Sequence, residues 1–302
     1  MSIDGANNTT IKGLAINNFD GDGVLVTGSG TGNKIQGSYI GVWFDGTSDA
    51  GNTGSGVYVN LTSETIIGSN GDGTGEAWER NLIAANDSYG VYVSGTTTSV
   101  AGNFLGVTYE GSVALGNAGG VFINSSYAVI GTNNDGTNDS TEGNVSSGHS
   151  GTGIYITGTG STANTIAGNY IGVGQDGSLD LGNGTHGIWL LSSASDNTIG
   201  GVDNDTVNVI AYNGDAASEY GVYLSGANTD NNKIYRNTIY SNQSEGIKLA
   251  FDGANDNQVA PAIIKNVLNG TTTNIIGTTE ASGLVQLFEA SADNEGQSYL
   301  GE

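Results

Sequence analysis

Residues 164–196, NTIAGNYIGVGQDGSLDLGNGTHGIWLLSSASD, decide the fold. The stretch contains three short apolar runs, at residues 165–166, 170–173 and 187–191, and each is bounded by Gly, Asn or Asp. Those residues mark turns, and the runs have the length of strands but lack the periodicity of an amphipathic helix. The stretch therefore predicts three short β-strands joined by turns.

Copies of this stretch recur along the chain, most of them separated by roughly thirty residues. We align eight units, which begin near Thr10, Asn33, Thr65, Ser99, Val129, Asn164, Asn197 and Asn232. The predicted first strands share an aliphatic column made by Ile11, Ile35, Ile67, Val100, Ile130, Ile166, Ile199 and Ile234. The second strands share Ala15, Ile40, Ile83, Leu105, Ser146, Ile171, Ile210 and Ile239. The third strands share two columns, Val24, Val57, Val91, Val121, Ile154, Ile188, Val222 and Ile247, and then Val26, Val59, Val93, Ile123, Ile156, Leu190, Leu224 and Leu249.

Three strands per unit, with like residues in columns, predict an all-β chain that forms a three-sided parallel β-helix of about eight rungs, about 4.8 Å apart. One rung cannot bury its apolar face alone, so stacking is what creates the core. A polar column supports this register just before the second strands, at Ser38, Asn81, Asn103, Asn144, Asn169, Asn208 and Asn237. We expect these side chains to form a ladder of amides in the turn, with no role in chemistry.

The composition excludes several classes of partner. Of 302 residues, 7 are Lys or Arg and 30 are Asp or Glu, which gives a net charge of −23. This charge argues against nucleic acid and anionic membranes and favours cations. No apolar run is long enough to span a membrane, and the N-terminal residues lack a signal-peptide hydrophobic region. The sequence has no Cys, which excludes disulfides but does not decide the compartment.

Several motifs along the repeat resemble a known family. They read N-T-I-x-G-N-Y-I-G-V, G-N-x-x-x-G-V/I and I-G-T-N-x-D-G-T, and they cover about residues 8–260. They resemble the right-handed parallel β-helix repeat regions of large bacterial surface or secreted proteins, which have the fold of the pectate-lyase-like superfamily. The resemblance implies a right-handed helix over residues 1–260 and a secreted or cell-surface setting, as part of a longer protein. Residues 261–302 would then form a short C-terminal β segment, the start of a truncated β-sandwich module.

The loops after the first strands of alternate rungs carry a repeated spacing of oxygen side chains. Counted from Gly68 and from Gly131, oxygen side chains stand at positions 3, 5, 9 and 12, with Gly at position 6. This is the spacing of an EF-hand-type calcium loop, although position 1 is Gly and no flanking helices are evident. The predicted calcium ligands are Asn70, Asp72, Glu76, Glu79, Asn133, Asp135, Asp139 and Glu142. A turn that needs no ion explains the spacing equally well.

An aromatic stripe runs along the third strands. The residue between the two aliphatic columns is, rung by rung, Leu25, Tyr58, Tyr92, Phe122, Tyr155, Trp189, Tyr223 and Lys248. Side chains alternate along a strand, so these residues point away from the core. We expect the six aromatic residues to contact polysaccharide or a cell-surface glycan by stacking on sugar rings. The competing interpretation is that the stacked rings only stabilise neighbouring strands.

The residues that could carry catalysis do not align in the repeat. A polysaccharide lyase or hydrolase needs a basic side chain or two close carboxylates on one face. Arg80 and Arg236 share a column but lie several rungs apart, and His149 and His186 occupy different columns. Scattered surface charge explains the arginines. His186, beside Trp189, is the remaining candidate for an active site.

These observations predict a non-catalytic extracellular repeat module, a stalk or adhesive surface that is stabilised by calcium and contacts glycans. We expect a monomer that neither binds nucleic acid nor inserts into a membrane. The alternative is a polysaccharide-active enzyme, a lyase or hydrolase, of the pectate-lyase-like superfamily. Basic or carboxylate side chains clustered in one groove would favour the enzyme, and an uninterrupted aromatic face would favour the module.

Overall fold

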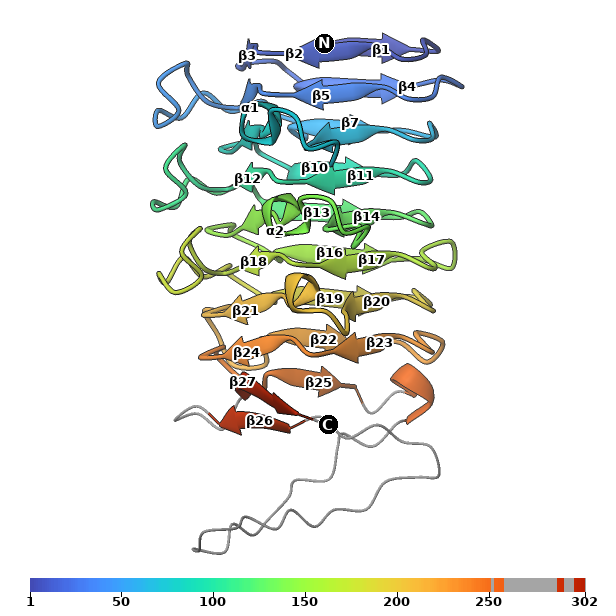
Figure 1. The fold of residues 1–302 in the computed structure, drawn as a ribbon, viewed down its shortest axis with the longest axis vertical. Coiled ribbons are helices and arrows are strands. Elements are labelled where there is room, and N and C mark those ends of the chain that lie inside the picture. The colour runs from blue at the N-terminus through green and yellow to red at the C-terminus, as the bar shows by residue number, and fades with distance from the viewer. Residues whose placement is uncertain (251–252, 258–286, 291–295, 302) are drawn as a thin grey trace, which may run out of the picture.

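A computed structural model describes residues 1–250, 253–257, 287–290 and 296–301, and residues 1–250 form a stack of three parallel sheets (Figure 1). Sheet A contains β1 (Ser2–Asp4), β4 (Val24–Thr27), β7 (Val57–Val59), β10 (Tyr89–Val93), β13 (Gly119–Ile123), β16 (Ile154–Thr157), β19 (Ile188–Leu191), β22 (Val222–Leu224) and β25 (Ile247–Leu249). Sheet B contains β2 (Thr10–Lys12), β5 (Lys34–Gln36), β8 (Ile66–Gly68), β11 (Ser99–Ala101), β14 (Val129–Gly131), β17 (Thr165–Ala167), β20 (Thr198–Gly200) and β23 (Lys233–Tyr235). Sheet C contains β3 (Ala15–Ile16), β6 (Tyr39–Ile40), β9 (Leu82–Ile83), β12 (Phe104–Leu105), β15 (Val145–Ser146), β18 (Tyr170–Ile171), β21 (Val209–Ala211) and β24 (Thr238–Tyr240).

Every third strand along the chain joins the same sheet, so each turn of the chain adds one strand to each side. This confirms the predicted three-sided parallel β-helix of about eight rungs. The register is also the predicted one: Ile130 pairs with Ile166 in sheet B, and Ile171 pairs with Ile210 in sheet C. Almost all residues of the aliphatic columns are buried in one continuous cluster inside the helix.

One position in the predicted columns is wrong. Ile16, not Ala15, pairs with Ile40 and is buried, whereas Ala15 lies opposite Tyr39 and is exposed. Ile16 follows Ile11 at the same separation as Ile40 follows Ile35, so the geometry of the turn between sheets B and C is the same in both rungs. The small apolar side chain of Ala15 concealed this shift in the alignment.

Buried asparagine ladders hold the turns in register. In the predicted ladder, Asn103 Nδ2 donates to Asn144 Oδ1 at 3.0 Å and to Ile67 O at 2.8 Å, while Asn103 N donates to the same Asn144 Oδ1 at 2.9 Å. Two further ladders were not predicted. One consists of Asn52, Asn86, Asn117, His149, Asn183, Asn213 and Asn242. The other contains Asn164, Asn197 and Asn232. Each amide satisfies backbone groups that a dry turn would otherwise leave unpaired.

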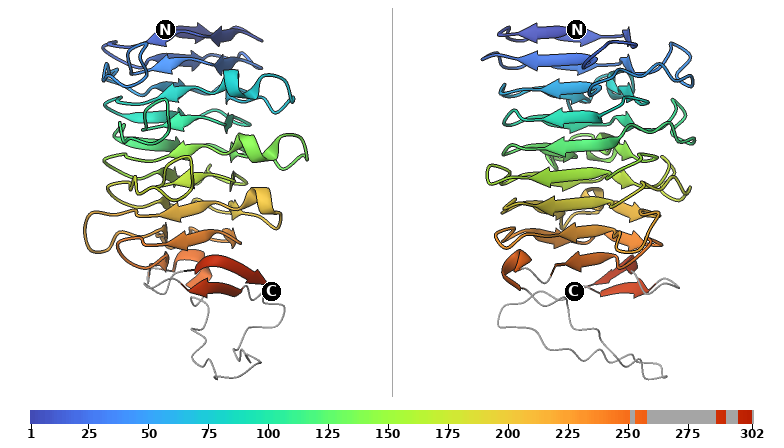
Figure 2. Two further views of the ribbon diagram at one scale, coloured as in Figure 1. Left: turned by 60° about the vertical axis from the view of Figure 1, so that its left-hand side comes forward. Right: turned by 180° about the vertical axis from the view of Figure 1, so that it is seen from behind.

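Two kinds of loop project from the stack, each kind aligned along its length (Figure 2). We call residues 41–52, 106–117 and 172–183 the extended loops, and residues 68–81, 131–144 and 200–208 the helical loops. The helical loops contain α1 (Glu76–Glu79), α2 (Asp139–Glu142) and η1 (Asn204–Thr206), short helical turns that the sequence did not predict. Extended loops contact one another across two rungs, because Tyr109 N donates to Gly46 O and Gln175 N donates to Gly111 O.

Sheet C is covered on both faces. On its outer face a second apolar cluster joins Leu82, Phe104 and Val145 of the strands to Val42 and Val107 of the extended loops. The extended loops therefore shield part of the sheet from water, and this layer was not predicted.

Near the C-terminus the described elements are η2 (Ala254–Asn257) and the antiparallel strands β26 (Leu287–Ala290) and β27 (Gly296–Gly301). Most of residues 261–302 lies outside the described residues, so the β-sandwich module remains a prediction. None of the helices in the described part of the chain has the length and apolar character needed to cross a membrane.

Candidate functional site

The aromatic stripe lies on the outer face of sheet A in the predicted register. Tyr92 pairs with Phe122, Phe122 with Tyr155, and Tyr155 with Trp189. All six aromatic residues, Tyr58, Tyr92, Phe122, Tyr155, Trp189 and Tyr223, are half-buried, and their rings contact one another without interruption. The rung spacing of about 4.8 Å brings successive rings to stacking distance.

The orientation of these rings differs from a flat platform for sugars. The ring centroids of Tyr92 and Phe122 are 4.3 Å apart at an interplanar angle of 23°, and those of Phe122 and Tyr155 are 5.2 Å apart at 20°. Ring faces in this part of the stripe therefore rest on neighbouring rings, and ring edges face outward. Only the four tyrosines of the stripe carry hydroxyls, so a ligand on this part of it would contact ring edges and separate hydroxyls rather than open ring faces.

His186 belongs to this aromatic layer. Its ring packs against Trp189 at 4.9 Å, Tyr223 at 4.9 Å and Tyr220 at 5.6 Å, and only 6% of the residue is exposed. Its Nδ1 accepts the N–H of Tyr220 at 2.9 Å. Burial lowers the pKa of His186 to about 4, so the imidazole is neutral at pH 7. A buried ring whose Nδ1 accepts a backbone N–H is a poor proton acceptor for an external substrate.

The helical loops bury the last predicted calcium ligand of each set. Glu79 and Glu142 are 5% and 3% exposed, and each accepts a backbone N–H through Oε2, from Asn70 at 3.0 Å and from Asn133 at 3.1 Å. Lys12 Nζ lies 3.7 Å from Glu79 Oε1. Burial, and then the neighbouring carboxylates, raise the pKa of Glu142, which forms no ion pair with the described residues.

The other predicted ligands close turns within their own loops. Asp72 accepts the N–H of Thr74 at 2.8 Å, and Glu76 accepts that of Gly73 at 2.8 Å. Asp135 and Asp139 repeat this arrangement, accepting the N–H of Thr137 at 2.8 Å and of Gly136 at 3.0 Å, and Asn70 and Asn133 donate to the Asp two residues later. Among the described residues, no three His, Asp or Glu side chains lie together as metal ligands. Calcium binding therefore stays a prediction.

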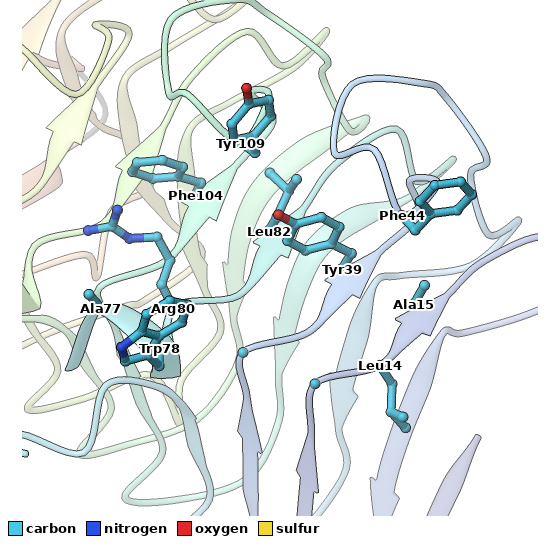
Figure 3. Close-up of a pocket in the computed structure, with 12 residues that line it drawn as sticks. Leu14, Ala15, Tyr39, Phe44, Ala77, Trp78, Arg80, Leu82, Phe104 and Tyr109 are labelled. Atoms are coloured by element: carbon cyan, nitrogen blue, oxygen red, sulfur yellow. The ribbon is translucent and has the colours of Figure 1, made fainter. Parts of the chain in front are cut away.

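A groove that the sequence did not predict lies outside sheet C, between a helical loop and two extended loops (Figure 3). Its volume is about 430 Å³, within the range of ligand-binding sites. Tyr39, Leu82 and Phe104 contribute the strand side of the groove, and Phe44, Trp78 and Tyr109 come from the loops. The groove is where the apolar cluster outside sheet C reaches the surface.

The loop residues of this groove expose large aromatic side chains. Phe44 and Trp78 are 82% and 80% exposed, and Tyr109 is 49% exposed. No ring contact joins these three residues to another aromatic side chain in the described part of the chain. Unlike the stripe on sheet A, the groove therefore offers open ring faces.

Arg80 is the charged side chain of the groove. Its guanidinium carbon lies 4.2 Å from the centre of the Phe104 ring, and its Nε donates to Gly102 O at 2.9 Å. Burial lowers the pKa of Arg80, yet arginine stays protonated at neutral pH. The sequence pattern indicated scattered surface charge for Arg80, whereas the structure holds its guanidinium against the ring of Phe104.

A sequence signal for the groove does exist. Trp43 and Phe44 stand side by side in the first extended loop, Tyr109 follows in the second, and Trp78 lies in the first helical loop. Phe44 and Tyr109 occupy the same position before the acid-Gly pair of successive extended loops, and Trp78 stands where the second helical loop has Thr141. Exposed aromatic residues gathered in this way indicate a contact surface. Comparisons of the chain with protein-family models, curated proteins and solved structures found no match.

Proposed function

We propose that the chain is a non-catalytic extracellular module, a stalk or adhesive surface in a longer bacterial surface or secreted protein, which contacts polysaccharide or cell-surface glycans. The family resemblance supports the right hand of the helix and the extracellular setting. Nine parallel strands at about 4.8 Å give sheet A a length of roughly 40 Å, which suits a rigid spacer.

The observation that carries the glycan contact is the uninterrupted aromatic stripe. It places an aromatic ring on six successive rungs along one face, and four of these rings carry hydroxyls to which a polymer rich in hydroxyl groups can hydrogen-bond. The net charge of −23 favours neutral glycans over acidic ones on this face.

A polysaccharide-active enzyme is the second candidate, and the positions of the histidines do not favour it. His149 is 2% exposed, its Nδ1 accepts the N–H of Asn117 at 3.2 Å, and burial lowers its pKa to about 3. His186 is buried in the aromatic layer with its Nδ1 likewise occupied. Neither imidazole reaches a ligand lying on the sheet surface, so neither suits the role of general base.

The test is a screen of wild-type protein against neutral and acidic polysaccharides that reads both binding and cleavage. We expect binding without product release, and weaker binding in the double variant Tyr155→Ala with Trp189→Ala, which removes adjacent rings of the stripe. Tyr127→Ala is the matched control, because Tyr127 is an exposed tyrosine that lies outside the stripe. Unchanged affinity in the double variant would remove the stripe as the contact surface, and release of shortened chains would replace the module with an enzyme.

Calcium enters this proposal as a stabiliser of the helical loops. The repeated spacing of oxygen side chains and the excess of acid over base support it. Without an Asp at position 1, each site should be weak, with a Kd of roughly 10⁻⁴–10⁻³ M, as in extracellular modules.

A further inference from the structure

The groove beside Arg80 has the composition of a protein-binding site. Aromatic residues and arginine are enriched in the centres of protein–protein interfaces, whereas Lys, Glu, Asp and Ser are depleted there. The groove follows this pattern within a chain that has 30 Asp and Glu. Its lining contains Trp78, Arg80, two Tyr, two Phe and two Leu, but no Lys, Glu, Asp or Ser.

We propose that this groove binds an extended protein segment that carries bulky apolar side chains next to a carboxylate. The apolar side chains would pack between Trp78 and Phe44, over Tyr39 and Leu82, and the carboxylate would accept hydrogen bonds from Arg80. The proposal is independent of the glycan contact, because the groove lies on sheet C and the aromatic stripe on sheet A.

The terminal nitrogens of Arg80 are free to bind a carboxylate. Nε is occupied by Gly102 O, and the ring of Phe104 covers one face of the guanidinium. The Nη atoms form no hydrogen bond or ion pair with the described residues. A planar guanidinium held in place in this way matches the two oxygens of a carboxylate.

The nearby acidic side chains have partners other than the guanidinium of Arg80. Glu79, the preceding residue, faces Lys12 and the N–H of Asn70. Glu76 accepts the N–H of Gly73, and Glu110 accepts the hydroxyl of Tyr109 at 3.0 Å. Arg80 is therefore the charged side chain that the groove lining presents to a partner, and its guanidinium favours a carboxylate there.

A saccharide fits the groove less well than a protein segment. Sugars need many hydrogen-bond partners, and the polar side chains of the lining are limited to Arg80, Trp78 and two tyrosines. The hydroxyl of Tyr109 already donates to Glu110. Exposed Trp, Tyr and Phe rings with a single arginine instead match the anchor residues of protein interfaces.

The experiment uses a phage-displayed library of random heptapeptides, selected on the wild-type protein. We expect the selected peptides to share adjacent bulky apolar residues and an Asp or Glu. The best sequence is then synthesised in two forms, with its acidic residue and with the corresponding amide. Fluorescence polarisation measures the affinity of both forms for the wild type, Trp78→Ala, Arg80→Gln and Tyr127→Ala, and thermal melting checks that each variant is folded.

Trp78→Ala should weaken both peptides by about thirtyfold, as expected for a central interface residue, and Tyr127→Ala should change neither. Arg80→Gln should weaken the acidic peptide by about tenfold and leave the amide peptide unchanged. An equal loss for both peptides in Arg80→Gln would overturn the pairing with a carboxylate. Three results would overturn the docking site itself. The selected peptides could bind Trp78→Ala as tightly as wild type, or a saccharide could compete with the peptides for the groove. The third result is self-association of the wild type that Trp78→Ala abolishes.

Discussion

Replacing the buried pair Ser146 and His149 should change how the fold responds to acid. Ser146 is 1% exposed and occupies the second aliphatic column, where most other rungs have Ile or Leu. His149 occupies the ladder position between Asn117 and Asn183, where its neighbours in other rungs are Asn. The imidazole Nε2 lies 3.4 Å from Ser146 Oγ, so the large ring fills the space that the small serine leaves.

The magnitude follows from the pKa of His149. Burial lowers that pKa from 6.5 to about 3 in the folded state. The folded state therefore binds fewer protons than the unfolded state, so the stabilisation is complete above pH 6.5 and is lost as the pH falls toward 3. Each pH unit in this window costs about 1.4 kcal/mol, so His149 alone should lower the free energy of unfolding by about 2 kcal/mol between pH 6.5 and pH 5, and the lowered pKa of His186 adds a loss that all variants share. Measurements end at pH 5 because the isoelectric point is about 4.1, where solubility is lowest.

Urea unfolding followed by circular dichroism measures this loss in the wild type, in His149→Asn and in Ser146→Ala. The His149→Asn profile should be flatter than the wild-type profile by about 2 kcal/mol over this range, because an amide does not titrate. Ser146→Ala keeps the imidazole and should keep the wild-type slope. At pH 7, the double variant Ser146→Ile with His149→Asn should be more stable, by about 1–3 kcal/mol, than the sum of the two single changes predicts. The reason is that Ser146→Ile alone creates a clash and His149→Asn alone leaves a cavity. Parallel profiles for the wild type and His149→Asn would refute the argument.

Two further predictions concern the column register and the helical loops. Ile166→Asp places an unpaired charge inside the helix and should prevent folding or cost several kcal/mol, whereas a soluble variant with unchanged circular dichroism would contradict the register. Millimolar Ca²⁺ should raise the melting temperature and EDTA should lower it, and Glu79→Gln combined with Glu142→Gln should abolish most of this response. A wild-type melting temperature that ignores both additions would disprove calcium stabilisation.

The columns were predictable because stacking forces one residue type into each buried position. Ile35, Ile67 and Ile130 share a column because a parallel register places like side chains directly above one another. The outer cluster on sheet C was not predictable in this way. Leu82 and Phe104 each stand one residue before a member of the second aliphatic column, so their side chains lie on the outer face of sheet C. Their burial depends on extended loops that fold back over this face.

The register of the aromatic stripe was predictable, but the direction of its ring faces was not. Ring orientation depends on side-chain rotamers and on Tyr89 and Tyr220, which pack beside the stripe. The predicted calcium ligands show a similar difference. The spacing predicts Glu79 and Glu142 as the last calcium ligands of their loops, and only the structure shows that both carboxylates accept a backbone N–H.

Two features of the described chain differ in how far a substitution affects the fold: the groove on sheet C and the buried pair Ser146 and His149. In a solenoid the strands of each rung pair only with those of neighbouring rungs, so stability is close to a sum of local terms, and a change of an exposed loop side chain leaves the strands of other rungs intact. Exposed residues such as Trp78 and Phe44 can therefore vary without disturbing the strands below them. Ser146 and His149 are different, because they break buried columns and each compensates for the size of the other. Substitutions in the groove should therefore alter binding with little effect on melting, whereas substitutions in the buried pair should alter stability and leave binding in the groove intact.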